Sequence, residues 1–136
     1  MPKVLISLGS NLNREQNIQQ AIEQLSERFA ELMVSAQKET PDYTEAGAPY
    51  LNVVVAFETA YSPWSVRSVL KQLENDFGRD RSQPAKVSLD ADLLQYGDKM
   101  IHTGLLKLPS DDMQLSHIQA LIKTLELEPE DSGSSK

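Results

Sequence analysis

Residues 51–59, LNVVVAFET, carry the strongest strand pattern in this chain, and this segment constrains the fold more than any other. The run contains three consecutive valines, and β-branched residues are enriched in strands. Proline-containing segments bound it on both sides. An amphipathic helical pattern follows it closely, so the strand is predicted to belong to a fold in which strands and helices alternate.

Three further apolar runs predict three more strands. They cover residues 3–8, 32–36 and 87–94. The first of them is closed by the turn sequence Gly9-Ser10-Asn11. Residues 39–49 are polar and contain proline, and they are predicted to be a loop. A loop of this length in a compact chain is usually functional or disordered, which makes it a candidate binding loop.

Two amphipathic helices are predicted between the strands. Asn13 and Gln16 have the spacing of a capping box at the start of the first. Its buried face would contain Ile18, Ile22, Leu25 and Phe29. The second helix begins at Ser62-Pro63, an N-cap followed by proline at the first helical position, and ends at Gly78. Its buried face would contain Val66, Val69, Leu70, Leu73 and Phe77.

The predicted order of elements is therefore β-α-β-β-α-β, which is typical of an α+β, ferredoxin-like βαββαβ sandwich. An extra C-terminal helix is expected over residues 112–127. Its inward face would contain Leu115, Ile118, Ile122 and Leu125. Residues 1–127 are predicted to form a single domain. Residues 128–136 are acidic and lack large apolar groups, so a disordered tail is expected there.

The composition excludes several classes of function. The formal net charge of −7 argues against a nucleic-acid-binding surface, because duplex binding depends on neutralising phosphates. It does not exclude ATP, whose phosphates need only a local basic cluster. The chain has no cysteine, which rules out disulfides and thiolate chemistry and agrees with a cytoplasmic location. Neither a signal peptide nor a membrane-spanning run is expected.

Asp90 and Asp92 form the pair most suggestive of chemistry. Side chains two apart on a strand point to the same face, so the two carboxylates would project together while Leu89, Ala91 and Leu93 enter the core. Convergent carboxylates suit Mg²⁺, which completes its shell with water and substrate phosphates. The alternative is a pair of solvated acids on an exposed sheet face.

The segment just before this pair strengthens the interpretation. Glu74, Arg79 and Arg81 gather one acid and two guanidinium groups at the predicted end of the second helix. Guanidinium groups bind phosphate oxygens through paired, charge-assisted hydrogen bonds. A metal site that is preceded in the chain by such a cluster predicts that a nucleotide is the third component of the site.

Four segments of the chain resemble one enzyme family. They are LISLGSNL at residues 5–12, Thr40-Pro41 with Pro49-Tyr50-Leu51-Asn52, ENDFGRDR at residues 74–81, and LDAD at residues 89–92. In this order they look like the 6-hydroxymethyl-7,8-dihydropterin pyrophosphokinases of folate biosynthesis. The resemblance implies a ferredoxin-like fold and transfer of diphosphate from ATP to the hydroxymethyl group of the pterin, which yields AMP and the pterin diphosphate.

The same resemblance implies two Mg²⁺ ions, ATP as co-substrate and a monomeric chain whose partners are ATP and the pterin. The implied metal ligands are Asp90 and Asp92. The implied catalytic residues are Asp90, Asp92, Arg79 and Arg81. The implied nucleotide-binding residues are Glu74, Lys86, Leu93 and Asp112. The implied pterin-binding residues are Thr40, Pro41, Tyr50 and Asn52.

The chain departs from the family pattern around the expected triphosphate. Residues 82–88 are shorter than the family's loop and contain Lys86 where the family has arginines and a tryptophan. Ser110 stands where the family has histidine, and Leu105 where it has an arginine. Three interpretations stay open: a slow pyrophosphokinase, a catalytically impaired relative that acts as a pterin- or nucleotide-binding or regulatory module, and an unrelated ferredoxin-like sensor.

Overall fold

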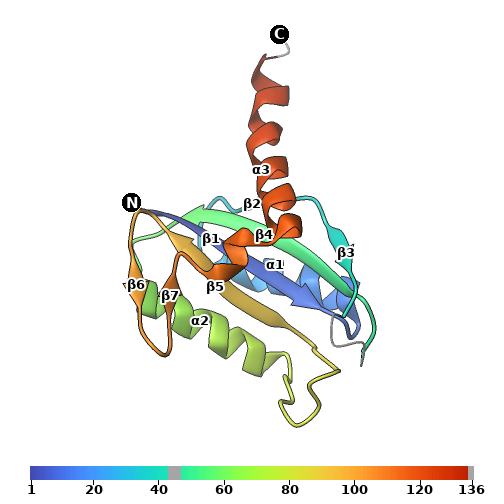
Figure 1. Ribbon diagram of the computed structural model, residues 1–136. Coiled ribbons are helices and arrows are strands. Elements are labelled where there is room, and N and C mark those ends of the chain that lie inside the picture. Colours follow the sequence, from blue (N-terminus) through green and yellow to red (C-terminus); the bar gives the residue numbers. More distant parts are fainter. Residues whose placement is uncertain (43–46, 135–136) are drawn as a thin grey trace.

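The computed structural model describes residues 1–42 and 47–134 and has an α+β fold built on an antiparallel sheet (Figure 1). The elements in chain order are β1 (Lys3–Ser10), α1 (Arg14–Arg28), β2 (Met33–Val34), β3 (Lys38–Thr40), β4 (Tyr50–Glu58), α2 (Pro63–Asp76), β5 (Asp90–Tyr96), β6 (Ile101–His102), β7 (Lys107–Leu108), the 3₁₀ helix η1 (Asp111–Gln114) and α3 (Ser116–Ser134). The main sheet has the order β2-β4-β1-β5, and β3 also pairs with β4.

Helices cover both faces of this sheet. Helices α1 and α2 bury apolar side chains against one face, where β1, β4 and β5 contribute every second residue. The other face packs against α3 through a smaller cluster made of Val54, Ala56, Leu94, Ile118, Leu121 and Leu125. The C-terminal part of α3 projects beyond the sheet (Figure 1). None of the helices within the described residues combines the length and apolar character needed to cross a membrane.

The predicted ends of α2 are confirmed. Ser62 accepts a hydrogen bond from the Ser65 N–H, and Pro63 is the first helical residue. Gly78 adopts φ +76°, in the left-handed region that favours glycine, and its N–H donates to the Asn75 carbonyl at 3.0 Å. The chain can therefore turn sharply after α2 and return to β5.

The predicted capping box at the start of α1 is wrong. Asn13 is left-handed, with φ 46° and ψ 46°, and its side chain makes no capping hydrogen bond. Asn17 instead donates through Nδ2 to the Leu12 carbonyl at 2.8 Å and the Ser88 carbonyl at 3.0 Å. The start of α1 is thus fixed by contacts to another segment of the chain rather than by a local cap.

Several strand boundaries differ from the predictions. The second strand, predicted over residues 32–36, is reduced to β2. Residues 38–40, partly inside the predicted loop, form β3, because they pair with residues 50–52 of β4. Residues 43–46 of that loop lie outside the described residues. The last main strand begins at Asp90 rather than at Val87.

The C-terminal region also departs from the predictions. A short hairpin, β6–β7, and the turn η1 precede α3. Leu115 lies between η1 and α3 and is 42% exposed, so its predicted inward orientation is wrong. Helix α3 runs to Ser134, past the predicted end at Leu127. The disordered tail over residues 128–136 stays a prediction. Residues 135–136 lie outside the described residues.

A buried carboxylate ties α2 to the last strand of the sheet. Glu74, fully buried near the C-terminal end of α2, accepts the Ala91 N–H of β5 at 2.8 Å through Oε2. Its Oε1 accepts from Arg81 at 2.8 Å and from Lys71 at 3.5 Å. Since a buried charge without partners is costly, these contacts hold the helix end, the following loop and the start of β5 together.

We expect Glu74→Gln to lower the free energy of unfolding by about 1.5 to 3 kcal/mol, because an amide keeps the shape but loses the charge-assisted bonds. Denaturant titration of the variant measures this loss. Glu23→Gln, which alters an exposed acid on α1, is the matched control and should change stability by less than about 0.5 kcal/mol. Equal stability of the two variants would contradict the role of Glu74.

Candidate functional site

Gly9 sits between two polar residues of neighbouring strands. It pairs with Asn52 of β4 on one side and with Asp90 of β5 on the other. Directly opposed residues face the same side of a sheet, and strands lie about 4.8 Å apart, so Asn52 and Asp90 face the same side about 10 Å from each other. A Cβ on Gly9 would lie 3.3 Å from Asn52 Oδ1. The absence of a side chain at Gly9 therefore lets the side chains of Asn52 and Tyr50 approach the β1 backbone closely.

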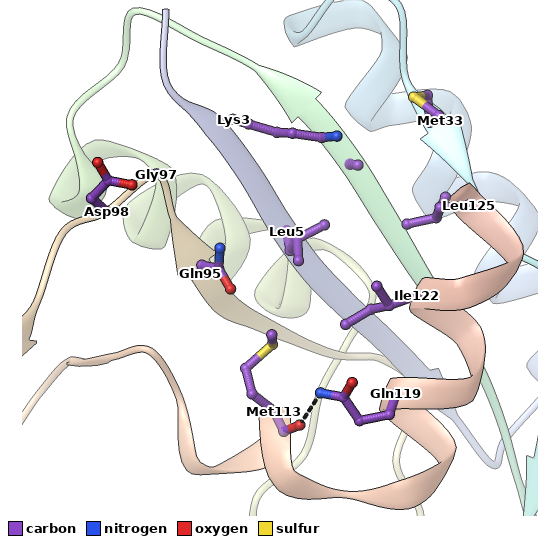
Figure 2. Close-up of a pocket in the computed structure, with 11 residues that line it drawn as sticks. Lys3, Leu5, Met33, Gln95, Gly97, Asp98, Met113, Gln119, Ile122 and Leu125 are labelled. Carbon is purple, nitrogen blue, oxygen red and sulfur yellow. Dashed lines mark hydrogen bonds between the residues drawn. The ribbon is translucent and has the colours of Figure 1, made fainter. Parts of the chain in front are cut away.

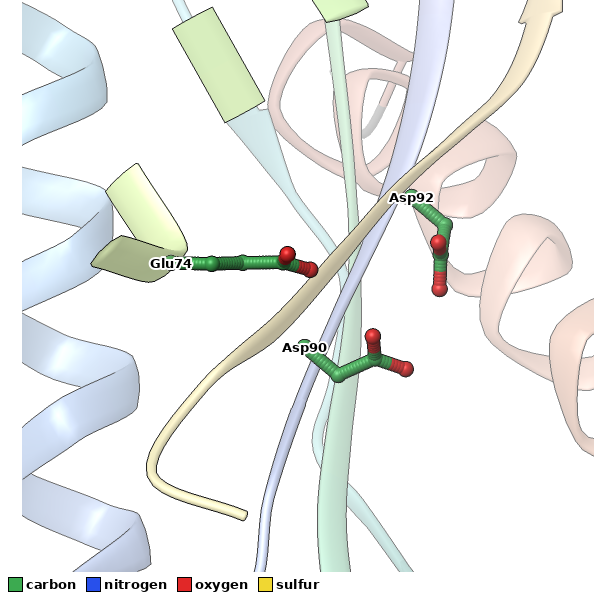
Figure 3. A group of neighbouring side chains, drawn as sticks. All are labelled: Glu74, Asp90 and Asp92. Carbon is green, nitrogen blue, oxygen red and sulfur yellow. The ribbon is translucent and has the colours of Figure 1, made fainter. Parts of the chain in front are cut away.

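Three carboxylates gather at the start of β5. Oxygen atoms of Glu74, Asp90 and Asp92 all lie within 4.8 Å of one another. Asp90 and Asp92 project to the same side of β5, as the period of two predicts, while Glu74 approaches from α2 on the other side (Figure 3). The oxygens of Glu74 are already hydrogen-bonded to the protein, so Asp90 and Asp92 are the two acids available to a cation.

Two acids of this region, Asp92 and Asp112, have raised pKa values. Burial, the nearby Asp90 charge and a hydrogen bond to Asp90 raise the pKa of Asp92 to about 8, with Glu74 adding to the effect. Burial and the charge of Asp90 also raise the pKa of Asp112. Negative charge is therefore in excess here, and a bound cation would relieve it.

The two predicted arginines differ in exposure. The Arg79 side chain is 16% exposed, and its Nη1 donates to the Leu89 carbonyl at 3.2 Å and lies 3.5 Å from Asp90 Oδ1. The Arg81 side chain is 57% exposed although its Nη2 contacts Glu74. Arg79 thus orients the Asp90 carboxylate, while Arg81 remains open to solvent beside it.

A cavity of about 290 Å³ opens next to Asp92. It lies between the faces of α2 and β5 and the segment from β7 to η1. Three cations line it: Arg67, Lys71 and Lys107. The acids that line it are Asp92, Asp111 and Asp112. The sequence prediction missed the three cations. Arg67, Lys71 and Glu74 are spaced four and three apart on α2, a spacing that could have placed them on one helix face.

Two predicted nucleotide-binding residues, Leu93 and Lys86, and the two departures from the family pattern, Ser110 and Leu105, are distributed unevenly around this cavity. Leu93 belongs to the core and also contributes to the cavity wall. Ser110 lines it too, and its hydroxyl accepts the Asp112 N–H at 3.1 Å as the cap of η1. Leu105 is 69% exposed, and its carbonyl accepts from Arg67 Nε at 3.0 Å. Lys86 is exposed on the 82–88 segment and does not line the cavity.

The predicted pterin-binding residues meet beside Gly9, except for Pro41, which is exposed. Thr40 is buried and pairs with Tyr50 across β3 and β4. Asn52 donates both amide hydrogens to the protein, to the Lys38 carbonyl at 3.0 Å and to Thr40 Oγ1 at 2.9 Å. Asn52 therefore leaves only Oδ1 available toward Gly9.

Tyr50 connects this region electrostatically with the metal-site acids. Burial raises the pKa of the Tyr50 hydroxyl, and the charges of Asp42 and Asp90 raise it further, while Arg79 opposes them. The phenol therefore stays neutral near pH 7 and presents an apolar face with a polar tip. Its interaction with Asp90 indicates that the two predicted binding regions adjoin.

A larger hollow of about 570 Å³ lies elsewhere, over the face of the sheet that α3 partly covers (Figure 2). Leu5, Met33, Met113, Ile122 and Leu125 point into it or along its walls. Its charged residues, Lys3 and Asp98, form no cluster of acids or of cations, so the chemistry of a polyphosphate site is found at Asp92 instead.

Comparison with known proteins identifies the family of this chain. A family model described as 7,8-dihydro-6-hydroxymethylpterin-pyrophosphokinase (HPPK) matches residues 5–128. The 2-amino-4-hydroxy-6-hydroxymethyldihydropteridine pyrophosphokinase of Haemophilus influenzae is 35% identical over 115 residues, which cover 79% of this chain and 71% of the relative. The enzyme of that name from Pseudomonas putida is 32% identical, covering 79% of this chain and 92% of the relative. The Bacillus subtilis enzyme of that name is 33% identical, covering 79% and 68%.

The matched residues include the Gly9 turn, the acids of β5 and the loop after α2. The family match extends over most of the chain, and the resemblance predicted from four short motifs is confirmed. The chain belongs to the 7,8-dihydro-6-hydroxymethylpterin-pyrophosphokinase family.

Proposed function

We propose that this chain transfers diphosphate from ATP to the hydroxymethyl group of 6-hydroxymethyl-7,8-dihydropterin, yielding AMP and the pterin diphosphate. The observation that carries the proposal is the Asn52–Gly9–Asp90 row across the sheet. It aligns the amide acceptor of Asn52 with Asp90, an acid of the proposed metal site, and Gly9 carries no side chain between them. A ferredoxin-like arrangement of the fold is part of this proposal, supported by the strand order β2-β4-β1-β5.

The acids of β5 fit Mg²⁺. Their donor set is two carboxylates from one strand face, and the pKa of Asp92 is raised by burial and, after that, by the nearby charge of Asp90. We assign both implied ions to Asp90 and Asp92. Bound Mg²⁺ would neutralise charge that develops on the transferring phosphates.

The residues of the chain would then position the reactants. Asp90 lies between the Tyr50 region and the cavity, so its carboxylate can accept the hydrogen bond of the pterin hydroxyl and orient it. In the transfer, the oxygen of the pterin hydroxyl bonds to the β-phosphorus of ATP and gives up its proton to solvent. The bond from that phosphorus to the oxygen bridging to the α-phosphate breaks, and AMP leaves with that oxygen. Positioning and charge neutralisation supply most of the catalysis in such transfers.

More cationic side chains line the proposed triphosphate site than the sequence suggested. Arg67 Nε contacts the backbone of Leu105, the position at which the family pattern has an arginine. Arg67 thus brings a guanidinium from α2 to the place where the expected one is missing. With Lys71 and Lys107 it supports nucleotide binding in the cavity beside Asp92. A cytoplasmic location and a monomeric state stay predictions.

Formation of AMP and pterin diphosphate from ATP and the dihydropterin, in the presence of Mg²⁺, tests the function directly. We expect Asp90→Asn and Asp92→Asn each to reduce turnover at least about a hundredfold, since each removes charge that neutralises and orients the reactants. Asp98→Asn, an exposed acid after β5, is the matched control and should retain parental turnover. Tight ligand binding without product would favour the binding-module interpretation.

Magnesium affinity should depend on pH through Asp92. With a pKa of about 8, Asp92 holds a proton at pH 6.5 that Mg²⁺ must displace, so we expect roughly 20-fold tighter binding at pH 8.5. A raised acid pKa also means that the metal-free protein loses stability as pH rises from about 4 to 8. Calorimetric titration at both pH values measures the affinities. In Asp92→Asn the pH dependence should disappear; its persistence would contradict the assignment.

Removing the cavity cations should weaken nucleotide binding specifically. We expect Arg67→Gln and Lys107→Gln each to lower affinity for a non-hydrolysable Mg-ATP analogue by about 5- to 10-fold, with little effect on pterin affinity. Arg67→Lys keeps the charge and should recover part of the loss. Lys99→Gln, exposed in the turn after β5, serves as control. Unchanged affinity in both variants would exclude this cavity as the triphosphate site.

A further inference from the structure

Asn11 connects two segments that are distant in the sequence. It follows β1, and its Nδ2 donates to the Ala48 carbonyl at 3.1 Å and to the Ala85 carbonyl at 2.9 Å. Its Oδ1 accepts the Val87 N–H at 2.7 Å, and its own N–H donates to the Val87 carbonyl at 3.0 Å. One amide side chain therefore joins residue 48, next to the proposed pterin pocket, with residues 85–87, which lead to Asp90.

The two segments also contact each other closely. A Cβ added to Gly47 would lie 2.4 Å from the Ala85 carbonyl oxygen and 2.9 Å from Asn11 Nδ2. Contacts this short with backbone cannot be accommodated unless a segment moves. The backbone at residue 47 thus fits against residue 85 with no room for a side chain, and Asn11 bonds to both sides of this contact.

Two neighbouring residues, Arg14 and Asn17, each contact one of the two segments and do not connect one segment to the other. Arg14 donates to the Pro49 carbonyl at 3.3 Å and forms an ion pair with Glu39 at 2.8 Å. Asn17 donates to the Ser88 carbonyl on the other side. Asn11 differs from both because its side chain contacts the two segments at once.

We propose that Asn11 is a positioning residue that couples the pterin pocket to the nucleotide side of the site. This role rests on the proposed function. Pterin binding beside Tyr50 and Asn52 stabilises residues 47–49. Asn11 transmits the added order to residues 85–87, and so to the first acid of β5. By reciprocity, the nucleotide raises affinity for the pterin by the same factor.

Asn11→Asp tests the coupling, with Asn13→Asp as the matched control. The carboxylate can still accept the Val87 N–H but cannot donate to Ala48 and Ala85, whose carbonyl oxygens it would repel. Asn13→Asp introduces the same charge two residues on, where the side chain makes no capping bond. Without ligand, we expect amide exchange to accelerate in both 47–52 and 82–88 in Asn11→Asp and in neither in the control.

The coupling factor is the ratio of affinities for a non-hydrolysable Mg-ATP analogue with and without pterin, measured by calorimetry. We expect a factor of at least about 5 in the parent and in Asn13→Asp, and a factor near 1 in Asn11→Asp. Gly47→Ala, which forces the segments apart without changing Asn11, should also lose the coupling and serves if Asn11→Asp does not fold.

The outcomes separate this inference from the function on which it rests. If the parent binds neither ligand, the proposed function fails and the coupling with it. If the parent binds both ligands with a coupling factor of 1, or if Asn11→Asp keeps the coupling factor of the parent, only the coupling is overturned. Accelerated exchange confined to one of the two segments would likewise overturn the role of Asn11 as their connection.

Discussion

The buried carboxylate of Glu74 is the contact on which the site geometry depends. An ionised group removed from water must be hydrogen-bonded or paired, and Glu74 meets this need with the Ala91 N–H, Arg81 and Lys71. These partners come from the edge strand, the loop after α2 and α2 itself. Because Ala91 separates Asp90 and Asp92, the two acids proposed to bind metal, holding its backbone also fixes the carboxylates on either side. The position of the acidic pair is thus set from the opposite face of the sheet.

The charges around the cavity explain why metal and nucleotide should bind together. Arg67, Lys71 and Lys107 face Asp92, Asp111 and Asp112, so the cavity walls carry both signs. Lys107 is also held by Asp111 at 2.7 Å. A polyphosphate alone would meet acids that repel it, and a cation alone would add to the positive charge of Arg67, Lys71 and Lys107. Bound together, the two ligands satisfy both sets, which favours joint binding over binding of either one.

Long periodic segments were predictable from the sequence, and short ones were not. The runs that became β1, β4, α1 and α2 are long enough for periods of 2 and 3.6 to be read, and the ends of α2 carry their own cap and glycine signals. Strands of two or three residues such as β2 and β3 contain no period, and they exist because β4 offers a free edge to pair with. Likewise, nothing local indicates that Asn13 is left-handed, since the start of α1 is fixed by Asn17 reaching Ser88 across the fold.

Within the site, the sequence predicts which residues lie together when they are close along the chain, and it does not predict those that only the fold brings together. Asp90 and Asp92 were recognisable because one strand places them together. The cations were not, because Arg67 and Lys107 belong to different elements that meet only when the hairpin packs near α2. A motif-based view therefore counts Leu105 as the loss of an arginine, whereas Arg67 contacts the backbone at that position. Electrostatic attraction depends on where a charge lies and not on which residue carries it, so substitution at one motif position can be offset from another element. What such an exchange does not preserve is the angle of approach of the guanidinium, and that angle governs alignment of the phosphates more than their affinity.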